Sequence, residues 1–202
     1  MGLKRKEKFM RDKRIFKMTI TSLFIALIAI LALVPNIGFI PFGPYSITMV
    51  FIPVLVGALL FKTRMGVVLA IVFGICSLIV AFIRPSGPVD VVFQNPLVSI
   101  LPRAIFGLSI YPIYKIFNKV IKLEFISIPI SCFLAVVIHS VLTVSCMYIF
   151  GKEVIIEMVG SSNIFSVFAF FIGSAGIIEA TASALIVTPI VITLNKLPQI
   201  NE

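Results

Sequence analysis

The chain has 202 residues, of which 60% are hydrophobic and 12% charged, and its formal net charge is +9. A soluble domain is nearer to half apolar, so this composition excludes an ordinary soluble enzyme and indicates one membrane-embedded helical bundle. The basic residues border apolar segments, so positive-inside anchoring explains the charge better than nucleic-acid binding does.

The first 17 residues form a basic arm that contains eight of the 17 Lys and Arg residues. We expect this arm to be cytoplasmic and to contact anionic lipid heads, at about 1 kcal/mol per basic residue near the surface. It does not resemble a cleaved signal, because no small-x-small cleavage site with polar mature sequence follows the first apolar run. The predicted domains are an arm (1–17), a membrane domain (18–196) and a cytoplasmic tail (197–202).

Six apolar runs follow the arm. A membrane-spanning helix needs about 20 residues, so these runs predict an all-α membrane protein with six transmembrane helices. The second run is short and the sixth is long, which predicts bilayer thinning at one and tilt at the other. The runs cover residues 18–34, about 47–61, 66–83, about 99–117, 126–150 and 164–194.

The basic residues alternate between the two sides of these six spans. On one side lie the arm and the connections between spans two and three, between spans four and five, and after span six, with 14 of the 17 basic residues. The other side holds Arg84, Arg103 and Lys152. Because Lys and Arg collect in cytoplasmic loops, both termini are predicted to be cytoplasmic.

The outward loops, 35–46, 84–98 and 151–163, are longer than most of the inward turns. The first reads PNIGFIPFGPYS and combines three prolines and two glycines with the aromatic residues Phe39, Phe42 and Tyr45. Long loops rich in Pro and Gly often carry binding functions. A solvated connector is the alternative, but it needs no apolar side chains, so a packed lid or binding loop is favoured.

Glu179 and Arg103 are the charged residues that matter most within the apolar runs. An ionisable group at membrane depth costs about 2.5–3.5 kcal/mol on insertion scales, so it usually faces a cavity or a partner. Small residues surround Glu179 in GSAGIIEATASA, which leaves room for a ligand or for a structural contact with another helix. Arg103 opens the fourth span, where it pairs with Glu179, holds a ligand carboxylate, or snorkels to the interface.

His139 and Asn95 are polar residues that could contact a ligand or could have a structural role. His139 lies in the fifth run with Thr143 four residues later, on the same helix face. A lone histidine there is more often a hydrogen-bonded structural residue than a ligand contact. Asn95 precedes Pro96 and either caps a turn or projects into a cavity below the loops.

Catalytic and metal-binding patterns are absent from the sequence. It contains no HExxH, GxSxG or Walker motif, so the chain is not expected to be an enzyme or to hydrolyse ATP. Cys76, Cys132 and Cys146 lie in apolar runs without a CxxC pair, which predicts buried free thiols. No metal or cofactor is therefore expected.

Several segments together resemble a known family, the substrate-binding S components of energy-coupling factor (ECF) vitamin transporters. The similarity extends from Lys17 to the end of the chain, and IPVLVGALL and NPLVSILPR are most similar to the pantothenate-type branch. The segments are ITMVFIPVLVGALLF, GVVLAIVFGICS, FQNPLVSILPRAIFGLSIY and IIEA.

The resemblance implies a bacterial plasma-membrane protein that binds a micronutrient from outside. It also implies docking onto a transmembrane coupling subunit carried by two ATP-binding subunits, through small residues of the first helix: Ser22, Ala26 and Ala29. Serine stands at the first position, where the family has alanine. The family's substrate-binding positions correspond to Phe42, Tyr45, Asn95, Arg103, His139, Asn163 and Glu179.

The chain has no Trp, which favours a small aliphatic carboxylate such as pantothenate over a stacked ring system. Arg103 or Arg84 is the expected partner of that carboxylate. Two other classes stay open at this point: a six-span scaffold of a cell-envelope complex, and an autonomous secondary carrier.

Overall fold

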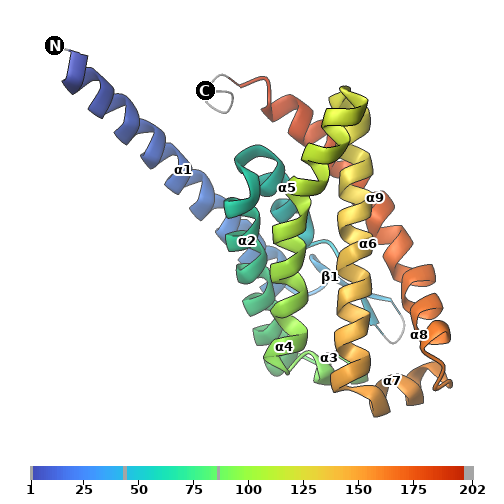
Figure 1. Cartoon of the computed structure of the whole chain (residues 1–202). Helices are drawn as coiled ribbons and strands as arrows, with labels where there is room; N and C mark the ends of the chain where they lie inside the picture. The colour runs from blue at the N-terminus through green and yellow to red at the C-terminus, as the bar shows by residue number, and fades with distance from the viewer. Residues whose placement is uncertain (1, 43–44, 86, 198–202) are drawn as a thin grey trace.

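The computed structural model describes residues 2–42, 45–85 and 87–197, and the side chains of residues 2–14, 41, 42 and 45 lie outside that description. Long helices stand side by side around a short hairpin that follows the first helix (Figure 1). The elements are α1 (Gly2–Leu33), β1 (Phe39–Phe42), β2 (Tyr45–Thr48), α2 (Phe51–Ile83), α3 (Pro88–Val92), α4 (Pro96–Ser99), α5 (Leu101–Ile121), α6 (Glu124–Phe150), α7 (Lys152–Val159), α8 (Ile164–Phe171), the π-helix η1 (Ile172–Gly176) and α9 (Ile177–Leu194).

Five helical stretches of the described residues are long and apolar enough to cross a membrane. The predicted helical membrane fold is therefore confirmed. The predicted third span and residues 51–61 of the predicted second span fall within α2, whereas residues 47–48 belong to β2. The count of six crossings therefore stays a prediction. The five stretches are Ile15–Leu33, Phe51–Ile83, Pro96–Ile121, Glu124–Phe150 and Ile164–Leu194.

The helix α2 folds back on itself at Lys62, whose φ of 71° and ψ of −174° are not helical. A Cβ at Gly66 would lie 2.8 Å from the Cβ of Ala58. Residues eight positions apart in a straight helix are about 12 Å apart, so this contact requires a reversal. Segments 51–61 and 63–83 therefore pack side by side, and the reversal falls where Lys62 and Arg64 predicted an inward turn.

The first outward loop contains a β-hairpin, which the all-α prediction did not include. β1 and β2 are antiparallel, with Phe39 opposite Thr48 and Phe42 opposite Tyr45. Ile and Phe in β1 and Tyr, Ile and Thr in β2 are residue types that favour strands. The hairpin is the structural form of the packed loop that its aromatic residues predicted.

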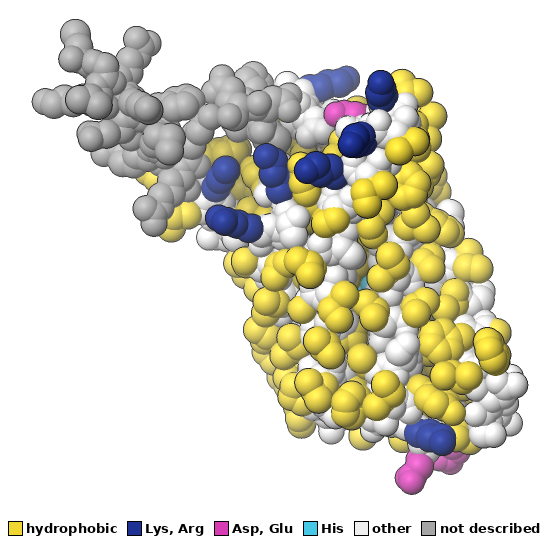
Figure 2. Space-filling model, in the orientation of Figure 1, with side chains coloured by type: hydrophobic (Ala, Val, Ile, Leu, Met, Phe, Trp, Pro, Cys, Tyr) yellow, Lys and Arg dark blue, Asp and Glu magenta, His cyan; other side chains and the backbone are white. Residues whose placement is uncertain are grey.

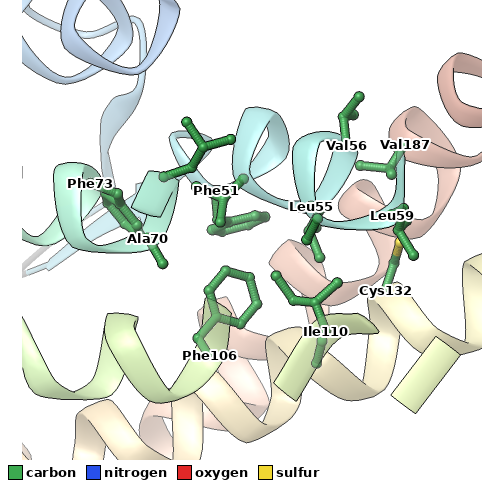
Figure 3. Close-up of a cluster of buried hydrophobic side chains, with 14 of the residues drawn as sticks. Phe51, Leu55, Val56, Leu59, Ala70, Phe73, Phe106, Ile110, Cys132 and Val187 are labelled. Carbon is green, nitrogen blue, oxygen red and sulfur yellow. The ribbon is translucent and has the colours of Figure 1, made fainter. Parts of the chain in front are cut away.

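The core of the bundle lies between α2, α5, α6 and α9. Phe106 and Ile110 of α5 point toward Phe51 and Leu55 of α2, and all four side chains are fully buried (Figure 3). Lipid tails are as apolar as these side chains, so van der Waals packing rather than apolar burial stabilises the contact within a membrane. This core forms the floor beneath the site described below.

The helices α2 and α5 approach most closely at two glycines. A Cβ at Gly66 would lie 2.7 Å from the carbonyl oxygen of Gly107, and a Cβ at Gly107 would meet the carbonyl of Gly66 at still closer range. Backbone atoms cannot move aside as flexible side chains do. Glycine at both positions is therefore required for this helix crossing.

We expect Gly107→Ala to lower the free energy of unfolding by about 1–3 kcal/mol, because the added methyl group overpacks the crossing. Unfolding by denaturant in detergent micelles measures the change. Gly173→Ala is the matched control, because a Cβ there meets nothing within 4 Å. Equal stability of the two variants would contradict the close crossing.

Basic side chains gather at the end of the molecule where α1 begins and α9 ends, above a broad apolar belt (Figure 2). Large apolar side chains are exposed in this belt; Leu185, for example, is 71% exposed. Such exposure suits contact with lipid rather than with water. The charge asymmetry expected from the sequence thus corresponds to two chemically distinct ends.

Candidate functional site

A cavity of about 130 Å³ lies between the hairpin, the second segment of α2, and helices α3, α5, α6 and α8–α9. At roughly 10–15 Å³ per water, it has room for several waters or for a small organic molecule. Its walls mix rings, hydroxyls and charges. The polar and charged lining residues are Asn36, Ser46, Thr48, Ser77, Arg84, Asp90, Arg103, His139, Ser140, Thr143 and Glu179.

Arg103 is the buried cation of the cavity. It lies in the first turn of α5 behind Pro102, is 4% exposed, and donates from Nη1 to the carbonyl of Val98 at 2.7 Å. The guanidinium carbon is 4.7 Å from the ring centroid of Phe93 and 5.4 Å from that of Phe73. These faces attract the cation. Its Nε is buried and has no hydrogen-bond partner among the described residues.

His139 of α6 lies on the floor of the same cavity. Its ring centroid is 5.0 Å from that of Phe106 and 6.2 Å from that of Phe73, and the side chain is 5% exposed. Nε2 is 3.5 Å from the hydroxyl of Thr143, the neighbour predicted at one helical turn. Nδ1 has no partner among the described residues. The histidine is therefore only partly satisfied by the protein.

Glu179 lies in the first turn of α9, directly after the π-helix η1, and is 7% exposed. Its Oε1 accepts a hydrogen bond from the backbone N–H of Thr48 at 2.5 Å. No ion pair with Arg103 is among the contacts recorded for the described residues. Each of the two buried charges instead has its own backbone partner, and both face one cavity.

The two asparagines of the predicted site cap helices. Asn95 Oδ1 accepts from the N–H of Leu97, and Asn163 Oδ1 accepts from the N–H of Phe165, each at 3.0 Å. These contacts begin α4 and α8 in the usual N-cap manner. Neither asparagine is among the cavity-lining residues of the described chain. The side chains of Phe42 and Tyr45 lie outside the described residues.

The predicted docking residues lie on α1, which packs mainly against α2. Ser22 and Ala26 are exposed, and Ser22 Oγ donates to the carbonyl of Met18 in the preceding turn. Ala29 is half-buried against the core. The available surface is thus centred on Ser22 and Ala26, beside the exposed apolar side chains of Leu23 and Leu27.

Several cavity residues were not predicted. Ser77, Ser140 and Phe93 line the cavity from α2, α6 and the loop after α3. Ser140 lies three residues before Thr143, so the helix face on which Thr143 was predicted could have indicated it. Thr48 contributes its backbone N–H and its side chain to Glu179.

The arrangement suits binding rather than covalent chemistry. A buried guanidinium in the wall, a partly satisfied imidazole and several hydroxyls favour a small polar molecule with an anionic end. The aromatic faces of Phe73 and Phe93 fit its apolar parts.

Comparison with known proteins gives two similarities. The sequence model of the family described as "ECF transporter, substrate-specific component" matches residues 16–191. The chain is also 31% identical over 97 residues to the "Pantothenate transporter PanT" of Leuconostoc mesenteroides subsp. mesenteroides. That alignment covers 46% of this chain and 48% of the relative, so the chain spans about half the length of that curated relative.

Proposed function

The chain belongs to the family of substrate-specific components of ECF transporters, and from that premise we propose that it captures pantothenate or a similar micronutrient outside the cell. Members of this family are transporter components, which is not an enzyme class. The chain is a multi-pass protein of a bacterial cell membrane, in keeping with its long apolar helices. We propose that an ATP-driven module, built from a transmembrane coupling subunit and two ATP-binding subunits, completes the importer.

The buried, incompletely hydrogen-bonded guanidinium of Arg103 in the cavity wall is the observation that carries this proposal. Pantothenate has a carboxylate at one end and hydroxyl groups at the other, with an amide between them. The carboxylate would pair with the guanidinium that lines the cavity, and charge-assisted hydrogen bonds of this kind are the strong ones. The hydroxyls of Ser77, Ser140 and Thr143 then lie within the same cavity for the polar remainder of the cargo.

Within the predicted set of site residues, we place the direct contacts at Arg103 and His139, with Glu179 at the edge beside the hairpin. Asn95 and Asn163 support the site by fixing where α4 and α8 begin. Phe42 and Tyr45, whose side chains lie outside the described residues, stay predicted members of the set. The name of the relative, a pantothenate transporter, supports pantothenate among the vitamins.

Isothermal titration calorimetry of the detergent-purified protein tests this function. Pantothenate, thiamine, riboflavin and biotin are titrated separately, and we expect pantothenate alone to saturate one site per chain. Saturation by another vitamin would support the transport role and show that the cargo is not pantothenate. Absence of heat with every vitamin would favour the envelope-scaffold alternative. Uptake by proteoliposomes that lack any ATPase would instead support an autonomous carrier.

We also propose six crossings with both termini in the cytoplasm, the two segments of α2 forming the second and third spans. A cysteine replacing Ser161 should react with a membrane-impermeant maleimide added to intact cells, in a background without native thiols. Cysteines replacing Thr63 or Lys119 should react only after the cells are opened. Labelling of all three positions in intact cells, or the reverse pattern, would contradict this topology.

A further inference from the structure

The Glu179 carboxylate bonds to the hairpin, and this contact needs no cargo. We propose that Glu179 is a clasp that holds the β1–β2 hairpin against the cavity through the backbone N–H of Thr48. Glu179 is then a positioning residue for the hairpin, and its main partner is the protein itself. The inference rests on the proposed function only in taking the cavity as the cargo site.

The register of the hairpin leaves the Thr48 N–H without a partner in the sheet. Met49 donates to the carbonyl of Gly38 at 2.7 Å, which makes those two residues a hydrogen-bonded pair. Antiparallel pairs alternate between hydrogen-bonded and non-hydrogen-bonded types. Phe39 and Thr48, the next pair, are therefore of the second type. The N–H of Thr48 consequently points away from β1, toward the free edge of β2.

Glu179 occupies that free edge. Its Oε1 accepts from Thr48 N at 2.5 Å, across 131 positions of sequence. An unpaired strand edge otherwise presents open donors, and a carboxylate is a strong acceptor for one of them. On the other strand, the ring of Phe39 lies 6.5 Å from that of Phe73 in α2. The hairpin is thus held to the bundle at both strands. The ring of Phe73 in α2 contacts β1, and the carboxylate of Glu179 in α9 accepts a hydrogen bond from β2.

The clasped strand forms part of the cavity wall. Ser46 and Thr48 of β2 and Phe39 of β1 all line the cavity. Movement of β2 away from Glu179 would remove two hydroxyl-bearing residues from the wall and widen the cavity on that side. We therefore expect cargo to enter when the clasp is open and to be retained when it is closed.

Hydrogen–deuterium exchange on ligand-free, detergent-purified protein tests the clasp. Glu179→Ala removes the acceptor, and Thr48→Pro removes the donor while leaving α9 unchanged. Proline is compatible with this position, because Pro41 already occupies the other non-hydrogen-bonded pair of the hairpin, opposite Ser46. We expect the amides of Ile40 and Ile47 to exchange at least tenfold faster in both variants, which corresponds to about 1.4 kcal/mol.

Two controls and a double variant sharpen the result. Thr48→Val keeps the N–H but removes the hydroxyl that also bonds to Glu179, and it should exchange like the wild type. Glu179→Gln keeps an acceptor oxygen and should fall between wild type and Glu179→Ala. If the two residues act through one bond, the double variant should exchange no faster than either single variant. Unchanged exchange in Glu179→Ala would overturn the clasp, as would additive effects of the two changes.

The result is separable from the proposed function, because exchange is measured without cargo. If the hairpin amides are protected in the wild type and exchange faster in both variants, the clasp is supported even if no vitamin binds. Pantothenate binding by a wild-type protein whose Glu179→Ala hairpin stays protected supports the cargo site and refutes the clasp. Thermal unfolding of each variant identifies any that fails to fold, and Thr48→Pro then decides the outcome.

Discussion

Arg103→Met should weaken cargo binding at least a hundredfold, about 2.8 kcal/mol, while the protein stays folded. The change removes a buried guanidinium of the cavity wall whose Nε has no partner among the described residues and whose face lies against Phe93 and Phe73. A methionine fills much of the same space without offering a donor. Calorimetric titration with pantothenate measures the loss, and thermal unfolding checks the fold.

Arg103→Lys and Arg84→Met are the informative comparisons. Lysine keeps the charge but not the planar fork, so we expect an affinity between wild type and Arg103→Met. Arg84 also lines the cavity but is only half-buried, so its replacement should cost less than tenfold. A larger loss of affinity in Arg84→Met than in Arg103→Met would indicate that Arg84 binds the cargo carboxylate. Binding within threefold of wild type in Arg103→Met would contradict the proposed site.

Ala26→Trp should abolish uptake while leaving cargo binding nearly unchanged. Ala26 and Ser22 lie one turn apart on the exposed side of α1, where small side chains let another helix approach closely. We expect an indole at this position to hold the proposed coupling subunit away without disturbing the cavity, because Ala26 is not among the described residues that line it. Uptake in cells and co-purification of the coupling subunit measure docking, and titration in detergent measures binding.

Leu27→Trp is the matched control for Ala26→Trp. Leu27 is already large and is 42% exposed, so a tryptophan there adds less bulk to the interface. We expect this variant to retain most of its uptake. Normal uptake by Ala26→Trp would remove the docking role from Ser22 and Ala26 and would strengthen the scaffold and autonomous-carrier alternatives.

The helices were predictable because a bilayer imposes a length and a charge rule on the sequence. The sixth predicted run, 164–194, has the same bounds as the last of the five membrane-length stretches in the structure. Lys62 and Arg64 predicted the position of the reversal within α2. Arg103, His139 and Glu179 were predictable for a related reason. Polar groups at membrane depth are rare enough to indicate a cavity or a partner.

The contacts around those residues were not predictable, because they depend on distant backbone. The acceptor of the Thr48 N–H lies 131 positions away in the sequence. Arg103 donates to the backbone carbonyl of Val98, and a backbone acceptor cannot be identified from residue types. Asn95 and Asn163 matched family positions, yet their side chains cap the helices that follow them. The hairpin was also missed, because eight residues flanking a turn give a weak strand signal beside long apolar runs.

Native mass spectrometry of the protein purified from its own cells tests the central proposal most directly. We expect one small molecule bound per chain, released on denaturation, that carries a carboxylate and has the mass of pantothenate. The same preparation of Arg103→Met should carry none. A wild-type protein that releases no small molecule and takes up none when pantothenate is added would contradict a cargo-binding cavity at Arg103.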